Sequence, residues 1–213
     1  MEREGAALND PTATAAHWDN AYARGERTLS WFEPTAAFSV RMIEAADVDR
    51  SAAVIDIGGG ASRLVDTLLG RGFSDLTVLD VSTAAEQETR RRLGERAARV
   101  RWLVQDVRRW RPDRIYRLWH DRAVFHFNTA RADLDGYLAA LDAGTAPGSV
   151  AVFATFAPDG PTHCSGLPVA RYSREQISAT LGDSWQPVLT ELEQHTTPSG
   201  AVQPFTWTVL RRR

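Results

Sequence analysis

The chain has 213 residues, of which 43% are hydrophobic and 24% are charged, a balance typical of one globular domain with a sizeable core. Its formal net charge of −2 gives no overall attraction to nucleic acid or to an anionic membrane surface. The sequence contains arginine but no lysine, which excludes a Schiff-base lysine and the lysine of a P-loop.

The cellular setting is inferred from what the sequence lacks. A single cysteine, Cys164, rules out an intrachain disulfide. The first sixteen residues contain no apolar stretch of the kind that marks a signal peptide. No apolar run approaches the roughly 20 residues that a membrane span needs. We therefore expect a cytoplasmic protein, a monomer or weak homodimer, that binds neither membrane nor nucleic acid.

The first part of the chain is expected to be helical and irregular. Residues 1–12 read as a frayed start. The aromatic-rich segment 17–34, "HWDNAYARGERTLSWFEP", is broken by a glycine and a proline and predicts a short helix followed by a loop. Residues 35–46 carry apolar side chains at helical spacing.

From residue 52 onward, patterns typical of strands and helices alternate. Strands are expected at 52–57, 76–81, 100–104, 114–121 and 148–156, and helices at 62–72, 83–97, 132–144 and 173–182. Ser82 and Ser173 are the expected helix caps. Residues 185–197 and 202–212 read as a closing antiparallel pair. The alternation predicts one α/β domain with a doubly wound, mostly parallel sheet. Residues 1–46 would form N-terminal helices and a lid, and 47–213 the core.

Acidic residues stand at the ends of four of the five predicted parallel strands. They are Asp56, Asp80, Asp106 and Asp121, the last preceded by His120, while the fifth strand ends at Phe156. Ligands of open parallel sheets bind at the carboxyl ends of the strands. We therefore expect these residues to meet at one edge of the sheet and to form a ligand site.

A glycine-rich turn, "VIDIGGGASRL" at 54–64, follows the first strand. It is not a P-loop, because the chain has no lysine. Gly58 and Gly60 match the first two glycines of a dinucleotide fingerprint, but Arg63 stands where the third belongs. The carboxylate of Asp56 would repel a pyrophosphate, whereas it would attract the ammonium and sulfonium groups of S-adenosylmethionine (SAM). An NAD-dependent oxidoreductase stays open as a minor alternative.

With these motifs in view, residues 17–211 resemble the class I SAM-dependent methyltransferases. "VIDIGGG", "TVLDVS" and "WLVQDVRRW" are similar to the first three motifs of that family. The segment 17–34 resembles the aromatic lid of small bacterial methyltransferases related to the thiopurine and tellurite methyltransferase groups. "RLWHDRAVFHF" resembles the motif that follows their fourth strand. The resemblance implies a Rossmann-like sheet of seven strands with a reversed last strand.

The resemblance also implies how SAM is held. Asp56 and the glycine turn would place its amino-acid end, Asp80 its ribose hydroxyls and Asp106 its adenine, with Trp31 covering it. The expected cofactor residues are Trp31, Asp56, Gly58, Gly60, Asp80, Val81, Asp106, Val107 and His120. Two departures, Gly59 where cysteine is frequent and Ser62 in place of a glycine, keep the turn small. Purely structural roles stay open for Asp56 as a turn cap, Asp106 as an ion-pair partner and Trp31 as a core residue.

The stretch "HDRAVFHF" at 120–127 holds the candidate catalytic residues His120, Asp121 and His126. Histidine is the natural general base near neutral pH. Arg122 is suited to binding an anionic substrate group through two hydrogen bonds. In the alternative reading, Asp121 pairs with Arg122 and His126 caps a helix.

The Pro- and Gly-rich loop 156–172 is expected at the mouth of the substrate site, because long loops of this kind tend to be functional. The expected substrate-binding residues are Tyr22, Phe32, Arg122, Phe125, Phe156, Cys164 and Arg171. No metal is expected, since one cysteine and scattered histidines give no ligand spacing.

The sequence thus predicts an enzyme that transfers a methyl group from SAM to a small nucleophile by direct displacement, releasing S-adenosylhomocysteine. A thiol or other chalcogen, or a carboxylate, is the favoured acceptor. Methylation of protein lysine and a SAM-binding module without catalysis are the alternatives.

Overall fold

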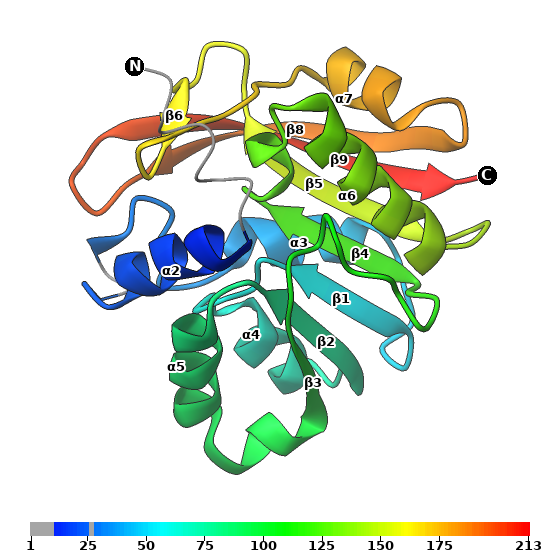
Figure 1. The fold of residues 1–213 in the computed structure, drawn as a ribbon. Helices are drawn as coiled ribbons and strands as arrows, with labels where there is room; N and C mark the ends of the chain where they lie inside the picture. The colour runs from blue at the N-terminus through cyan, green and yellow to red at the C-terminus, as the bar shows by residue number, and fades with distance from the viewer. Residues whose placement is uncertain (1–10, 26–27) are drawn as a thin grey trace.

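The computed structural model describes residues 11–25 and 28–213. A twisted sheet crosses the molecule, with helices on both of its faces (Figure 1). The helices are α2 (Pro11–Tyr22), α3 (Ala37–Ala45), α4 (Leu64–Gly70), α5 (Thr83–Leu93), α6 (Arg131–Gly144) and α7 (Arg174–Leu181), with the 3₁₀ helices η2 (Gly94–Arg99) and η3 (Phe125–Phe127). The predicted irregular start at 1–12 lies largely outside the described residues, and α2 begins at Pro11.

Seven strands form the sheet in the order β3-β2-β1-β4-β5-β9-β8. They are β1 (Ala53–Ile57), β2 (Asp75–Asp80), β3 (Val100–Val104), β4 (Leu118–Arg122), β5 (Val150–Phe156), β8 (Trp185–Thr196) and β9 (Val202–Arg212). The first five are parallel, and β9 runs antiparallel to both β5 and β8. The predicted mostly parallel sheet with a reversed last strand is therefore confirmed.

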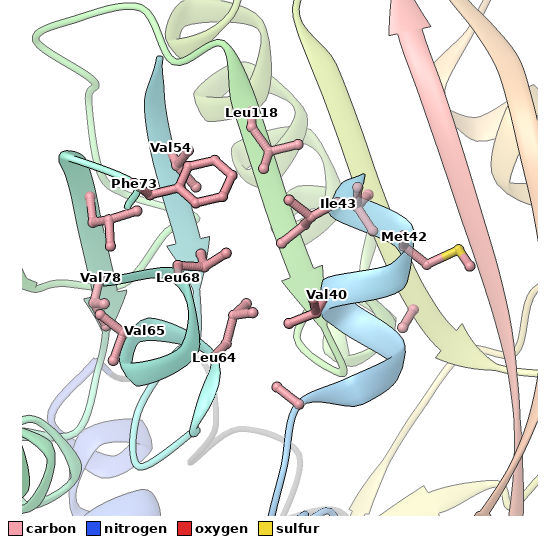
Figure 2. Close-up of a cluster of buried hydrophobic side chains, with 14 of the residues drawn as sticks. Val40, Met42, Ile43, Val54, Leu64, Val65, Leu68, Phe73, Val78 and Leu118 are labelled. Atoms are coloured by element: carbon pink, nitrogen blue, oxygen red, sulfur yellow. The ribbon is translucent and has the colours of Figure 1, made fainter. Parts of the chain in front are cut away.

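The helix α4 and its neighbour α3 pack on one face of the sheet through apolar side chains. The predicted stripe of α4, which includes Leu64 and Leu68, is buried, and Figure 2 shows these side chains gathered with Phe73 beside Val54 of β1. Each such leucine contributes about 1.5–3 kcal/mol of hydrophobic free energy. On the opposite face a second cluster joins α6 to β4 and β5. Every residue of β5 is buried, which is why its apolar run shows no alternation.

Two predicted caps position helices beside the carboxyl edge of the sheet. The hydroxyl of Ser82 accepts a hydrogen bond from the amide of Ala85 at 3.1 Å and starts α5 directly after β2. Ser173 and Gln176 form a capping box at the start of α7. The start of α5 thus lies close to the end of β2, and the start of α7 lies close to the end of β5.

Three predictions of secondary structure differ clearly from the structure, while other boundaries shift by one or two residues. The helix expected over 83–97 ends at Leu93, because Gly94 takes a φ of 58° that stops the α-helix, and η2 follows. The fourth strand begins at Leu118 and continues to Arg122, so His120 and Asp121 lie inside it. The loop 156–172 contains a hairpin of β6 (His163–Cys164) and β7 (Leu167–Pro168), whose two turn residues both have positive φ.

None of the helices in the described ranges has the length and apolar character needed to cross a membrane.

Candidate functional site

A cleft of about 240 Å³, called here the main cleft, lies at the carboxyl edge of the sheet. Figure 1 shows α2 lying across this edge, to which the arrowheads of β1 and β4 point. We call α2 together with residues 28–34 the lid. The residues that line the main cleft include Trp18, Tyr22, Trp31, Gly58, Asp80, Val81, Gln105, Asp106, Val107, Arg108, Arg122, Val124, Phe127, Asp133, Cys164 and Leu167.

The glycine turn after β1 is closely packed. Gly58 and Gly60 have φ values of 67° and 37°, a region that other residues rarely adopt. A Cβ atom on Gly58 would overlap the side chain of Val124. One on Gly60 would lie 2.6 Å from the Tyr22 hydroxyl and 2.7 Å from a carboxylate oxygen of Asp80. Both positions therefore require glycine. A turn without Cβ atoms also allows a ligand to approach the backbone closely.

Asp80 ends β2 at the floor of the main cleft and is only 8% exposed. Its Oδ1 accepts a hydrogen bond from the amide of Ser82 at 2.8 Å. Burial raises its pKa to about 7, the Ser82 amide opposes the rise, and the charge of Asp56 adds to it. A ligand that offered hydroxyl donors to this carboxylate would favour its charged form.

Asp106 also lines the main cleft, but its carboxylate is paired. Arg108 donates from Nε at 2.9 Å to Oδ1 and from Nη2 at 2.7 Å to Oδ2. Arg108 lies 3.3 Å from Asp133 as well. The ion pair anticipated as an alternative for Asp106 is therefore present, and the neighbouring backbone and Val107 complete this wall.

Asp56 and His120 form a buried pair between β1 and β4. The Nδ1 of His120 lies 2.7 Å from the Oδ1 of Asp56, so this nitrogen is the donor and the carboxylate oxygen accepts. Among the described residues, neither His120 Nε2 nor Asp56 Oδ2 has a hydrogen-bond partner. Both residues line a second cavity of about 50 Å³, whose other walls include Phe32, Glu33 and Arg63.

Asp121 is placed in the core and lines neither cavity. It is fully buried and accepts hydrogen bonds from the Tyr137 hydroxyl at 2.6 Å and from the amides of Val124 and Phe125 at 3.0 Å. Burial raises its pKa to about 6, which these hydrogen bonds oppose. The alternative pairing with Arg122 is not formed, because successive residues of β4 point to opposite faces. Asp121 anchors the turn after β4.

His126 lies among aromatic rings and also lines neither cavity. Its ring centroid is 4.6 Å from that of Phe127 and 4.8 Å from that of Phe156. Burial lowers its pKa to about 3, and the charge of Arg122 acts in the same direction. Neither ring nitrogen is hydrogen-bonded within the part of the chain that the structure describes. The ring stays neutral, and it does not cap a helix.

The expected substrate residues fall into three groups. Tyr22 and Arg122 line both the main cleft and the second cavity, Cys164 lines the main cleft, and Phe32 lines the second cavity. Phe125 and Phe156 are completely buried in the two core clusters. Arg171 donates to the carbonyl of Gly160 at 3.2 Å and stays outside both cavities. Trp31, expected over the cofactor, lines both cavities.

Sequence reasoning missed a buried polar cluster of Glu33, Glu193 and His195 behind Arg122. His195 Nε2 donates to the carbonyl of Ser30 at 2.8 Å, and Glu193 accepts from Trp207 Nε1 at 2.7 Å. One possible ligand atom from each of the three residues lies within 4.8 Å of the other two. The guanidinium of Arg122 lies beside Glu33 and already places a positive charge next to this cluster, so we assign no metal ion to it. The available signal was the spacing of Glu193 and His195, which stand two residues apart and therefore lie on the same face of β8.

The fold superposes on those of known methyltransferases over nearly the whole chain. A SAM-dependent methyltransferase from Anabaena variabilis superposes with a TM-score of 0.73, covers 95% of each chain and is 15% identical. The N-methyltransferase NodS from Bradyrhizobium japonicum, solved with S-adenosylhomocysteine, gives a TM-score of 0.68 over 91% of this chain and 99% of that one, at 16% identity. The chain therefore has the class I methyltransferase fold.

Comparison of the sequences gives a match over a smaller part of the chain. No family model matches the chain. EEF1A lysine methyltransferase 2 of Danio rerio is 35% identical over 85 residues, which is 36% of this chain and 36% of that protein. The match thus spans about a third of the curated relative's length. The resemblance to thiopurine and tellurite methyltransferases stays a prediction.

Proposed function

We propose that this protein is a SAM-dependent methyltransferase that acts on a small-molecule nucleophile. The observation that carries the proposal is the Asp80 carboxylate, buried at the floor of the main cleft beside a turn that only glycine permits. Burying a carboxylate without a counter-ion is costly, and a ribose diol would offset that cost with two hydrogen bonds. The fold and its methyltransferase neighbours support the same conclusion.

The residues present fit SAM at both of its ends. Asp80 would hold the ribose hydroxyls, with Val81 and Val107 beside the adenine. Asp56 lines the second cavity, and its Oδ2, which has no partner within the described ranges, suits the ammonium group, which a carboxylate stabilises. Trp31, which lines both cavities, would cover the join between the two ends.

When bound, SAM would supply a sulfonium-activated methyl group: the lone pair of a nucleophile would bond to the methyl carbon as the carbon–sulfur bond breaks, and the sulfur would keep the electrons of that bond in the released S-adenosylhomocysteine. The chain's own contribution is positioning and the exclusion of water by the aromatic lid residues Trp18, Tyr22 and Trp31. An anionic acceptor needs no base. For an acceptor that loses a proton, we propose His120 as the base, because Asp56 orients its ring and its Nε2 has no partner among the residues that the structure describes.

Calorimetric titration with S-adenosylhomocysteine tests the proposal. Asp80→Asn removes the charged acceptor and should weaken binding about 10-fold or more, since hydrogen bonds to charged groups contribute about 1.5–3 kcal/mol. Asp75→Asn is the matched control, because Asp75 begins the same strand and pairs with Arg114 away from the cleft. Equal affinity in the wild type and both variants would refute the site, and no binding to the wild type would refute the function.

Methylation of protein lysine is the second candidate, and the partial match to a lysine methyltransferase is the observation that favours it. Release of S-adenosylhomocysteine with a lysine-containing peptide, but with no thiol, carboxylate, amine or phenol of small size, would establish it. Tight binding of S-adenosylhomocysteine without turnover of any acceptor would instead indicate a binding module.

A further inference from the structure

The charges that line the main cleft are divided between its two ends. Asp80, Asp106 and Asp133 lie on the side of β2, β3 and α6, with Arg108 paired between the last two. On the side of β4, Arg122 is the one charged side chain among the described lining residues. Because β1 separates β2 from β4 and strands lie about 4.8 Å apart, the two ends are separated by roughly 10 Å.

Arg122 is a buried guanidinium whose hydrogen-bonding capacity is not filled. Its side chain is 12% exposed. Nη1 donates to the carbonyl of Trp31 at 2.9 Å, and Nη2 lies 3.2 Å from an oxygen of Glu33. Within the described ranges, Nε and Nη2 nevertheless have no acceptor in hydrogen-bonding geometry. Buried donors of this kind are rare unless a ligand or water satisfies them.

Glu33 does not fully neutralise this cation. It faces His120 and Arg122 from β4 and Glu193 and His195 from β8. Burial raises the pKa of Glu33 to about 7 against the opposing effect of Arg122, and the neighbouring carboxylate of Glu193 raises it further. Near neutral pH Glu33 is therefore only partly ionised, which leaves part of the charge of Arg122 for another anion.

The walls around Arg122 are apolar and aromatic. Trp18 meets Trp31 and Phe127 edge to face, with ring centroids 5.6 and 5.3 Å apart. Leu167 of the β6–β7 hairpin and Cys164 line the same part of the cleft. Burial raises the pKa of the Cys164 thiol to about 12, so that residue brings no negative charge. Such walls suit a flat apolar body rather than a polar chain.

We propose that the methyl acceptor is a small aromatic acid whose carboxylate or equivalent oxyanion binds the guanidinium of Arg122. The proposal rests on the proposed methyltransferase function. An ammonium group at this end would be repelled by the guanidinium, so the charge pattern opposes a lysine side chain as acceptor. A carboxylate also stands at the amino-acid end of the cofactor, and the experiment separates these two sources.

The test uses three small probes of nearly equal shape and different charge: benzoate, benzamide and benzylamine. Each is titrated into protein saturated with S-adenosylhomocysteine. We expect the wild type to bind benzoate at least about 10-fold more tightly than either other probe, and Arg122→Met to abolish the preference. Arg171→Met, which alters an arginine outside both cavities, should leave it intact. A wild type without preference for benzoate, or a preference that survives Arg122→Met, overturns the proposal.

Two more measurements distinguish an acceptor site at Arg122 from a cofactor site and from a structural ion pair. Binding of S-adenosylhomocysteine and of methylthioadenosine, which lacks the carboxylate, is compared in Arg122→Met. Loss of the first with retention of the second assigns Arg122 to the cofactor and overturns the proposal. Glu33→Gln removes the competing anion and should tighten benzoate binding, which a merely structural role of the Arg122–Glu33 contact would not predict. Failure of the wild type to bind S-adenosylhomocysteine would refute the proposed function instead.

Discussion

Replacing the carboxylate of Asp80 by an amide is expected to stabilise the free protein while weakening ligand binding. The unfolded carboxyl ionises near pH 3.8, and burial in the fold raises its pKa to about 7. Above pH 7 the folded chain therefore holds a charge that the unfolded chain holds more easily. This difference in pKa between the folded and unfolded states corresponds to a destabilisation of the folded protein by about 4 kcal/mol, at roughly 1.36 kcal/mol per pKa unit. The destabilisation is fully present at pH 8.

This expected gain in stability is the opposite of the usual effect of replacing a buried polar residue. As the pH falls from 8 to 4 the folded carboxyl takes up its proton, and the destabilisation falls below about 1 kcal/mol. Asn cannot ionise, so Asp80→Asn should raise the melting temperature by about 10 °C at pH 8 and leave it nearly unchanged at pH 4. Thermal unfolding of both proteins at both pH values measures this. A variant that melts no higher than the wild type at pH 8 would refute the reasoning.

Three other substitutions probe the lid, the turn and the core. Asp19→Ala removes the carboxylate that accepts from the Ser82 hydroxyl at 2.6 Å and the Ala84 amide at 3.0 Å, and hydrogen exchange in α2 should accelerate roughly 10-fold or more, as measured by mass spectrometry. Gly60→Ala should abolish measurable calorimetric binding of S-adenosylhomocysteine, because its Cβ meets Tyr22 and Asp80 at positive φ. Tyr137→Phe leaves a buried carboxylate oxygen unsatisfied, so denaturant unfolding should show a loss of about 1–3 kcal/mol with binding of S-adenosylhomocysteine unchanged.

The fold was predictable because its signals are local. The apolar run of β5, the stripe of α4 and the serine caps each act within one element, and their order along the chain indicates a parallel sheet. The position of Asp80 followed from the same pattern, since a strand end is defined by where its apolar run stops.

The site was less predictable where it depends on contacts between distant segments. Asp121 and Arg122 are neighbours in the sequence, but the alternation of side chains along β4 places Asp121 in the core and Arg122 at the cleft. The sequence does not indicate which of the two faces the cleft, because that depends on where the lid packs against the sheet. The pairing of Glu33 with Glu193 and His195 joins the lid to β8, a contact that no spacing in the sequence encodes.

The insertion of β9 between β5 and β8 has a consequence for how the molecule assembles. Although β8 precedes β9 in the chain, its hydrogen bonds within the sheet are made to β9. During synthesis β8 therefore has no place in the sheet until β9 has emerged and paired with β5. The side chains of Glu193 and His195 reach the lid only after that step. The polar cluster behind Arg122 is thus completed last, and this side of the candidate site forms together with the final strand rather than with the domain's first half.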